Sequence, residues 1–95
     1  MKICVVGLGY LGVTHSLAMA KLGHEVTGID FDSSKVTSLS AGKVSFHEPG
    51  LYEALATALS AGLVRFQTSF DMAKSSSVVF ICVGTPQSKS NWSAE

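Results

Sequence analysis

The chain is short, rich in apolar residues and electrically balanced. It has 95 residues, of which 46% are hydrophobic and 15% are charged, with seven Lys and Arg residues against seven Asp and Glu residues. This length allows one domain at most. The apolar content excludes a disordered chain, and the balanced charge gives no electrostatic signal for DNA, RNA or an anionic membrane.

The two cysteines and the N-terminus indicate a cytoplasmic protein. Cys4 and Cys82 lie inside apolar runs without the spacing of a metal site or a disulfide framework, so we interpret both as small buried residues in a reducing compartment. The start of the chain imitates a signal peptide, but Gly7, Gly9 and Gly12 interrupt its apolar stretch. No apolar run in the sequence has the length that a membrane-spanning helix needs.

The first third of the chain has the pattern strand–helix–strand. Residues 2–6 form a short β-branched run that predicts a strand buried on both faces of a parallel sheet. Residues 10–22 predict a helix that stops at Gly23, a plausible left-handed position after its end. Residues 25–29 predict the second strand, which ends at Asp30.

Two further helices are expected in the middle of the chain. Asp32 or Ser33 can cap a helix that runs to about residue 41. A loop over 43–47 follows, and Pro49 is well placed for the first turn of another helix. Apolar residues then recur four positions apart and predict a buried helix face that ends at Gly62; they are Leu51, Leu55 and Leu59.

The last third predicts two more strands. Residues 64–67 alternate apolar and polar like a half-buried strand, and Thr68 or Ser69 can cap a short helix that runs to residue 73. Residues 78–83 are six apolar residues in a row, which predicts a fourth strand buried on both faces. The turn at 84–86 ends this strand, and the polar tail 87–95 is a linker or a truncated element.

Strands that alternate with helices indicate an α/β fold with a doubly wound parallel sheet of the Rossmann type. Right-handed connections predict the strand order 3-2-1-4. A complete domain of this type has about six strands, so the four expected here form an incomplete sheet. We expect residues 1–86 to be the N-terminal part of such a domain, with an apolar edge at the fourth strand.

The motif with the clearest chemistry is the sequence Gly7-Leu8-Gly9-Tyr10-Leu11-Gly12 between the first strand and the first helix. It fits the dinucleotide-binding pattern in the structural context that this pattern requires. The first glycine permits a sharp turn, the second leaves room for a pyrophosphate, and the third lets the helix pack close to the sheet. Amide groups over 8–11 are then expected to face the phosphates at the positive helix terminus, while the side chains of Tyr10 and Leu11 are free to vary.

Asp30 strengthens this interpretation. It follows the second strand, where a carboxylate can accept hydrogen bonds from the hydroxyl groups of the adenosine ribose. Its negative charge would repel a 2′-phosphate, which favours NAD over NADP as the cofactor. Asp32 is interpreted as a helix cap, and Lys35, taken alone, as a solvated surface lysine.

The chain offers no catalytic or metal site of its own. The three histidines have no partners at the spacing of a metal site or a catalytic triad, and we interpret them as structural or solvent-facing. Glu48, Glu53 and Asp71 do not form an acid–base pair, and we find no nucleophile with an identifiable base.

Four segments together resemble the UDP-glucose/GDP-mannose dehydrogenase family. They are the opening residues 1–12, the run 23–27 with Asp30 and Asp32, the segment 48–51 (Glu-Pro-Gly-Leu), and the segment 80–86 (Phe-Ile-Cys-Val-Gly-Thr-Pro). The resemblance implies NAD-dependent oxidation of the primary alcohol of a nucleotide sugar, such as UDP-glucose, to a carboxylate. By motif match, it implies that Leu11, Asp30, Lys35 and Thr85 contact the cofactor.

The resemblance also implies what lies elsewhere in such enzymes. Their catalytic cysteine, with lysine and asparagine helpers, their sugar-nucleotide site and their dimer-forming region are downstream, so Cys4 and Cys82 match no catalytic position. The 95 residues are therefore expected to bind NAD and to catalyse nothing alone, with a homo-oligomer expected for a full-length protein. Two alternatives stay open: a non-catalytic NAD-binding or regulatory module, and the cofactor part of a 3-hydroxyacyl-CoA or 6-phosphogluconate dehydrogenase relative.

Overall fold

Strands and helices alternate along the chain. The computed structural model describes residues 1–44 and 48–82. The elements are β1 (Lys2–Val6), α1 (Tyr10–Lys21), β2 (Glu25–Ile29), α2 (Ser33–Ser40), α3 (Leu51–Ser60), β3 (Val64–Gln67), the short 3-10 helix η1 (Asp71–Ala73) and β4 (Val78–Ile81). The predicted boundary at residue 86 and the tail 87–95 lie outside the described residues.

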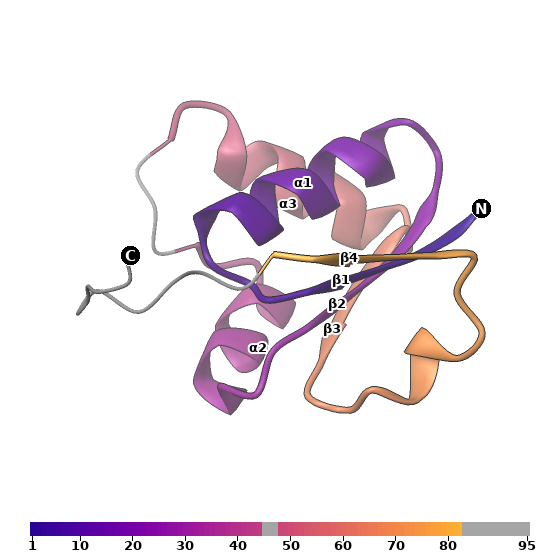
Figure 1. The fold of residues 1–95 in the computed structure, drawn as a ribbon. Helices are drawn as coiled ribbons and strands as arrows, with labels where there is room; N and C mark the ends of the chain where they lie inside the picture. The colour runs from indigo at the N-terminus through magenta and orange to yellow at the C-terminus, as the bar shows by residue number, and fades with distance from the viewer. Residues whose placement is uncertain (45–47, 83–95) are drawn as a thin grey trace, which may run out of the picture.

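The strands form one parallel sheet with the order β3-β2-β1-β4, which confirms the predicted order. The pairing brings the carboxyl ends of the strands into line, because Val6 pairs with both Ile29 and Ile81, and Ile29 pairs with Gln67. The loops that follow β1, β2 and β3 therefore start at one edge of the sheet, near the start of α1 (Figure 1). Ligands of open parallel sheets bind at this edge.

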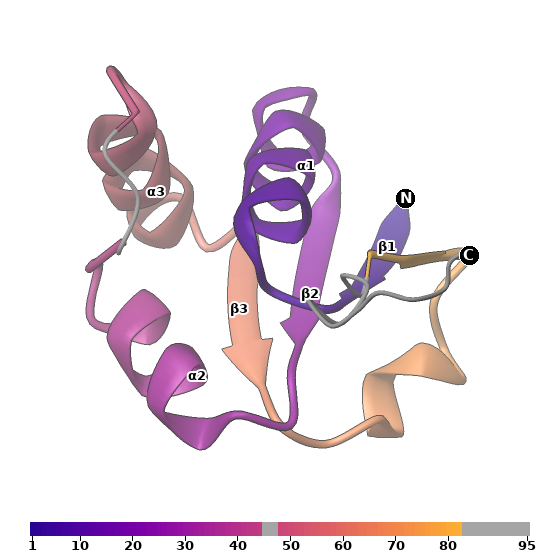
Figure 2. The ribbon, with the colours of Figure 1, turned by 60° about the vertical axis from the view of Figure 1, so that its left-hand side comes forward.

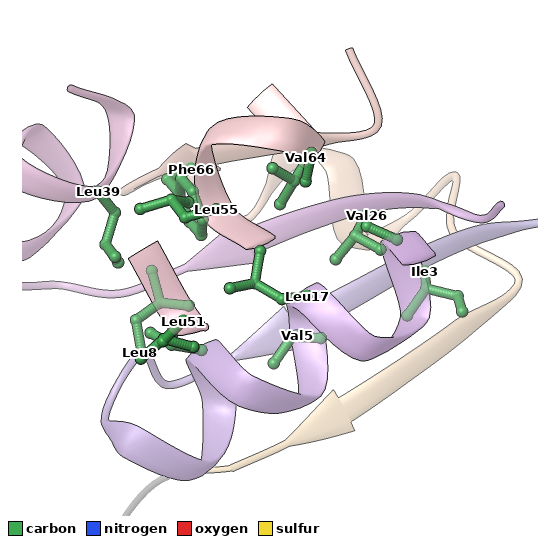
Figure 3. Packing of buried hydrophobic residues seen from close by; sticks show 13 residues of the cluster. Ile3, Val5, Leu8, Leu17, Val26, Leu39, Leu51, Leu55, Val64 and Phe66 are labelled. Atoms are coloured by element: carbon green, nitrogen blue, oxygen red, sulfur yellow. The ribbon is translucent and has the colours of Figure 1, made fainter. Parts of the chain in front are cut away.

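The main core lies between the sheet and three helices. Helices α1 and α3 cover one face, and α2 lies beside β3 (Figure 2). Apolar side chains from β1, β2, β3 and these helices meet there (Figure 3); among them Val5 and Leu55 are fully buried. On the other face, Ala73 of η1 packs against a smaller group that consists of Cys4, Val6 and Ile29. Burying these apolar surfaces is the main force that holds the layers together.

Strand β4 differs from the prediction of burial on both faces. Its side chains alternate between half-buried and exposed, and Val79 and Ile81 are 41% and 66% exposed. The reason is its position: among the described strands, β4 is at the edge of the sheet, and η1 covers only part of the adjacent face. By contrast, β1 and β2 are buried on both faces after their first residue, as predicted for β1.

Helix ends follow the sequence signals with two exceptions, of which the first is η1: its N-terminal cap is Phe70, and neither Thr68 nor Ser69 occupies that position. Gly23 and Gly42 have φ angles of +96° and +82° just after α1 and α2, as their positions predict. Pro49, expected in the first turn of a helix, lies before it. Gly50 caps α3 in the left-handed region at φ +83°, so the helix starts at Leu51.

None of the helices that the structure describes is both long enough and apolar enough to cross a membrane.

Candidate cofactor site at the carboxyl edge of the sheet

The glycine-rich loop turns sharply out of β1. Gly7 has φ +100°, a conformation that favours glycine, and its N–H donates to the carbonyl oxygen of Ile29 at 2.7 Å. This bond ties the start of the loop to the end of β2. Helix α1 then starts at Tyr10, with Gly9 as its N-terminal cap.

Gly12 lets α1 lie directly against this loop. A Cβ atom at Gly12 would be 1.7 Å from the carbonyl oxygen of Gly7 and 2.8 Å from its carbonyl carbon. No side chain fits at such distances, and the atoms in the way are backbone. The close packing that the third glycine of the motif predicts is therefore confirmed.

Gly9 occupies the opposite environment. A Cβ atom there would meet no atom within 4 Å, and Gly9 has no side chain to cap the helix. The first amide groups of an α-helix have no intrahelical acceptors, and the helix dipole places partial positive charge on them. This open, electropositive terminus fits an anionic phosphate group.

Asp30 joins the glycine-rich loop to the turn before α2. Its Oδ2 accepts a hydrogen bond from the amide of Leu8 at 2.8 Å, and its Oδ1 accepts one from the amide of Asp32 at 2.9 Å. The Leu8 amide, expected to face the phosphates, is thus directed at Asp30. The prediction for Leu8 is therefore wrong. The amides that follow Leu8 remain available to face a phosphate.

The Asp30 carboxylate keeps capacity for a ligand. An ionised carboxylate has about four acceptor positions, and the two backbone amides use one on each oxygen. The remaining positions match the two vicinal hydroxyl groups of a ribose. The same carboxylate can thus hold the loop and accept a ribose.

Gly28 is a feature of the loop's support that sequence reasoning missed. A Cβ atom there would lie 2.8 Å from the Leu8 Cδ2 atom and 2.8 Å from the Phe66 Cδ1 atom. Leu8 is only 1% exposed, so the second residue of the glycine-rich loop anchors it in the core. The sequence signal was a glycine inside a predicted strand, which often marks a position where another part of the chain approaches the strand backbone closely.

Lys35 lies near the loop, on α2. It lines a cavity of about 290 Å³ together with Leu8, Val13 and residues of α2 and the segment after it. Asp32 caps α2 as predicted and accepts from the amides of Ser34 and Lys35. The hydroxyl of Ser34 and the amide of Lys35 lower the pKa of the Asp32 carboxyl, because both hydrogen bonds stabilise its ionised form.

Tyr10 and Glu48 connect the start of α1 to the turn before α3. The Tyr10 hydroxyl donates to Glu48 Oε1 at 2.7 Å. This hydrogen bond and the negative charge of Glu48 raise the pKa of Tyr10. The Tyr10 side chain, expected to be free to vary, therefore has a specific contact with the Glu-Pro-Gly-Leu segment.

The other candidate residues take structural positions or lie outside the described part. His15 packs edge-on against Phe80, with ring centroids 4.3 Å apart, and His24 contacts the N-terminal amino group. Thr85 and His47 lie outside the described residues. Over 1–44 and 48–82, no three His, Cys, Asp or Glu side chains gather as a metal site would require.

The fold and this edge define a class of protein. A parallel sheet of this order, a glycine-rich turn into α1 and an acidic residue after β2 are the features of a Rossmann-type dinucleotide-binding domain. The sequence profile of the UDP-glucose/GDP-mannose dehydrogenase family, NAD binding domain, matches residues 1–95. The chain belongs to this family. This assignment is favoured over the alternative of a 3-hydroxyacyl-CoA or 6-phosphogluconate dehydrogenase relative.

Named relatives agree with this assignment. The chain is 40% identical over 90 residues to a GDP-mannose 6-dehydrogenase from Pseudomonas syringae, covering 94% of the chain and 20% of the relative. It is similar in structure to a UDP-glucose dehydrogenase from Pyrobaculum islandicum (46% identity, TM-score 0.83) and to a GDP-mannose dehydrogenase from Pseudomonas aeruginosa, solved as a ternary complex (40%, TM-score 0.85). Each structural match covers 90% of the chain and 20% of the solved protein. The chain thus spans about a fifth of the length of these relatives.

Proposed function

We propose that the carboxyl edge of the sheet binds NAD through the glycine-rich loop and Asp30. The pyrophosphate lies over Gly9, where the amides of Tyr10, Leu11 and Gly12 in the first turn of α1 face it. The adenosine ribose bonds to the Asp30 carboxylate, with Lys35 of α2 close by. Thr85 follows β4 in the sequence and is assigned to the cofactor by its motif alone.

The observation that carries this proposal is the pair of hydrogen bonds made by Asp30. They fix the carboxylate between the loop and the turn before α2, with acceptor positions left over for two hydroxyl groups. The fixed negative charge repels a 2′-phosphate, which supports NAD over NADP.

For the whole protein we propose the oxidation of a nucleotide sugar. NAD would supply the hydride acceptor; conversion of the primary alcohol to a carboxylate consumes two NAD molecules and one water, which provides the second carboxylate oxygen. The described residues contribute the cofactor site: they hold the phosphates, orient the ribose and set cofactor preference. Catalytic residues, the sugar-nucleotide site and subunit contacts belong to other parts of a full-length enzyme, which we propose to be a cytoplasmic homo-oligomer. The free thiols of Cys4 and Cys82 support a reducing compartment.

Calorimetric titration of the purified chain tests the cofactor proposal. NAD is expected to bind more tightly than NADP, and Asp30→Ala is expected to weaken NAD binding. Glu25→Ala is a matched control, because Glu25 is an exposed acidic residue at the opposite end of the same strand, β2. A folded chain that binds neither dinucleotide, or that prefers NADP, would contradict the proposal. Absence of binding by a folded chain would also favour a non-catalytic module or a non-functional fragment over the cofactor half of a dehydrogenase.

A further inference from the structure

Two phenylalanines form an exposed pair at the edge of the sheet that carries Asp30. Phe31 follows Asp30 directly, and Phe70 lies in the segment after β3. Their ring centroids are 5.2 Å apart, with an angle of 54° between the planes. Phe31 is 81% exposed and Phe70 is 41% exposed. The core does not use these rings, and most of the Phe31 surface is open to a ligand.

Matching turns fix the backbone at both phenylalanines. Asp30 Oδ1 accepts from the amide of Asp32 at 2.9 Å, which makes Phe31 the middle residue of the turn. Ser69 Oγ accepts from the amide of Asp71 at 3.1 Å, which does the same for Phe70. Such side-chain-to-backbone turns fix the local backbone. The hydrogen bond to Oδ1 thus restricts both the Asp30 carboxylate and the backbone of Phe31, so the base of the aromatic pair is fixed beside the carboxylate.

The chemistry of a nucleoside identifies the occupant. In adenosine the purine is bonded to C1′, the neighbour of the carbon that bears the 2′-hydroxyl, so a ribose held by Asp30 brings the purine within about one ring width of it. The next Cα along the chain is about 3.8 Å away. Aromatic side chains bind nucleobases by stacking, because every base has a π-face.

We propose that Phe31, supported by Phe70, stacks against the adenine ring of the bound dinucleotide. This inference rests on the proposed NAD site. Stacking contributes affinity without reading the hydrogen-bonding edge of the base, so the aromatic pair strengthens binding of the dinucleotide without selecting among bases. Asp30 then discriminates between NAD and NADP at the ribose, whereas Phe31 contributes affinity through the base.

The test compares three variants of the full chain: Phe31→Ala, Phe31→Leu and, as a matched control, Tyr52→Ala. Tyr52 is an aromatic residue on α3 that is 60% exposed. Calorimetry with NAD and with ADP-ribose measures affinity, and proton NMR of the adenine H2 and H8 signals reports ring currents from a stacked phenyl group. Thermal unfolding checks that each variant is folded.

We expect Phe31→Ala to weaken both ligands about tenfold and to remove the ring-current shift. Phe31→Leu should recover part of the affinity without the shift, and Tyr52→Ala should match the parent chain. If the parent chain binds NAD and Phe31→Ala binds it equally well, the stacking proposal is overturned but the proposed NAD site is not. A folded parent chain that binds neither ligand would overturn both.

Discussion

Replacing two glycines of the same loop by alanine should give opposite results. At Gly12 the new methyl group would meet the backbone of Gly7 at 1.7 Å, whereas at Gly9 it would meet nothing within 4 Å. Gly9 has φ −76°, which alanine adopts without strain. The loop therefore offers one position where the methyl group disturbs the fold and another where it disturbs only a ligand.

The size of each effect follows from these contacts. For Gly12→Ala, α1 must move from the loop by roughly 1 Å or more, and overpacking of this kind costs about 3 kcal/mol. The better helix propensity of alanine offsets about 1 kcal/mol. A net loss of about 2 kcal/mol lowers the Tm of a chain of this size by about 8–16 °C. Gly9→Ala loses less than about 1 kcal/mol at the helix cap.

Thermal unfolding by circular dichroism and calorimetry with NAD together measure both effects. Gly9→Ala should stay folded and lose NAD affinity by about tenfold or more, because its methyl group occupies the space proposed for the pyrophosphate. A Gly12→Ala chain as stable as the parent would refute the packing argument. A Gly9→Ala chain that is stable and binds NAD like the parent would refute the placement of the phosphates.

Three further perturbations test the hydrogen bonds and burial of the described residues. Asp30→Asn keeps one acceptor oxygen, so it should lose about 1 kcal/mol of stability and narrow the preference for NAD over NADP. Both are measurable by thermal unfolding and calorimetry, and an unchanged preference would count against the charge argument. Glu48→Gln, compared in a Tyr52→Phe background, should lower the pKa of Tyr10 in a tyrosinate absorbance titration. Since Glu48 raises this pKa in the folded chain, the contact stabilises the fold below the ordinary tyrosine pKa, and this stabilisation is lost as pH rises through the raised value. Identical Tyr10 titrations with and without the Glu48→Gln substitution would contradict the contact. Cys4 is buried, and burial raises the pKa of its thiol. In a Cys82→Ser variant, a thiol reagent should therefore modify Cys4 only as fast as the chain unfolds.

The sequence predicted the features that depend on local patterns. Strand order followed from alternation and connection handedness, and the helix ends followed from glycines and from the Asp32 cap. The glycine-rich loop was predicted because each of its glycines answers a steric demand, which Gly12 shows directly. These signals are encoded by neighbours in the chain, so periodicity and turn chemistry are enough to find them.

Contacts between distant segments were not predictable in the same way. Six apolar residues in a row look like a strand buried on both faces, and only the position of β4 at the sheet edge leaves Ile81 exposed. The Tyr10–Glu48 hydrogen bond spans 38 residues, and the Phe31–Phe70 pair joins two separate loops. The bond from Leu8 to Asp30 was missed for the same reason, although both residues were already assigned to the site.

The most direct test of the NAD site is an amide NMR titration of the ¹⁵N-labelled chain with NAD. Binding as proposed should shift the amide signals of Gly9, Tyr10, Leu11 and Gly12, and those of residues 30–35. Signals from the last turn of α3, which leads into the start of β3 at the opposite edge of the sheet, should change little. Shifts confined to α3, or a spectrum that saturating NAD leaves unchanged, would contradict the cofactor site.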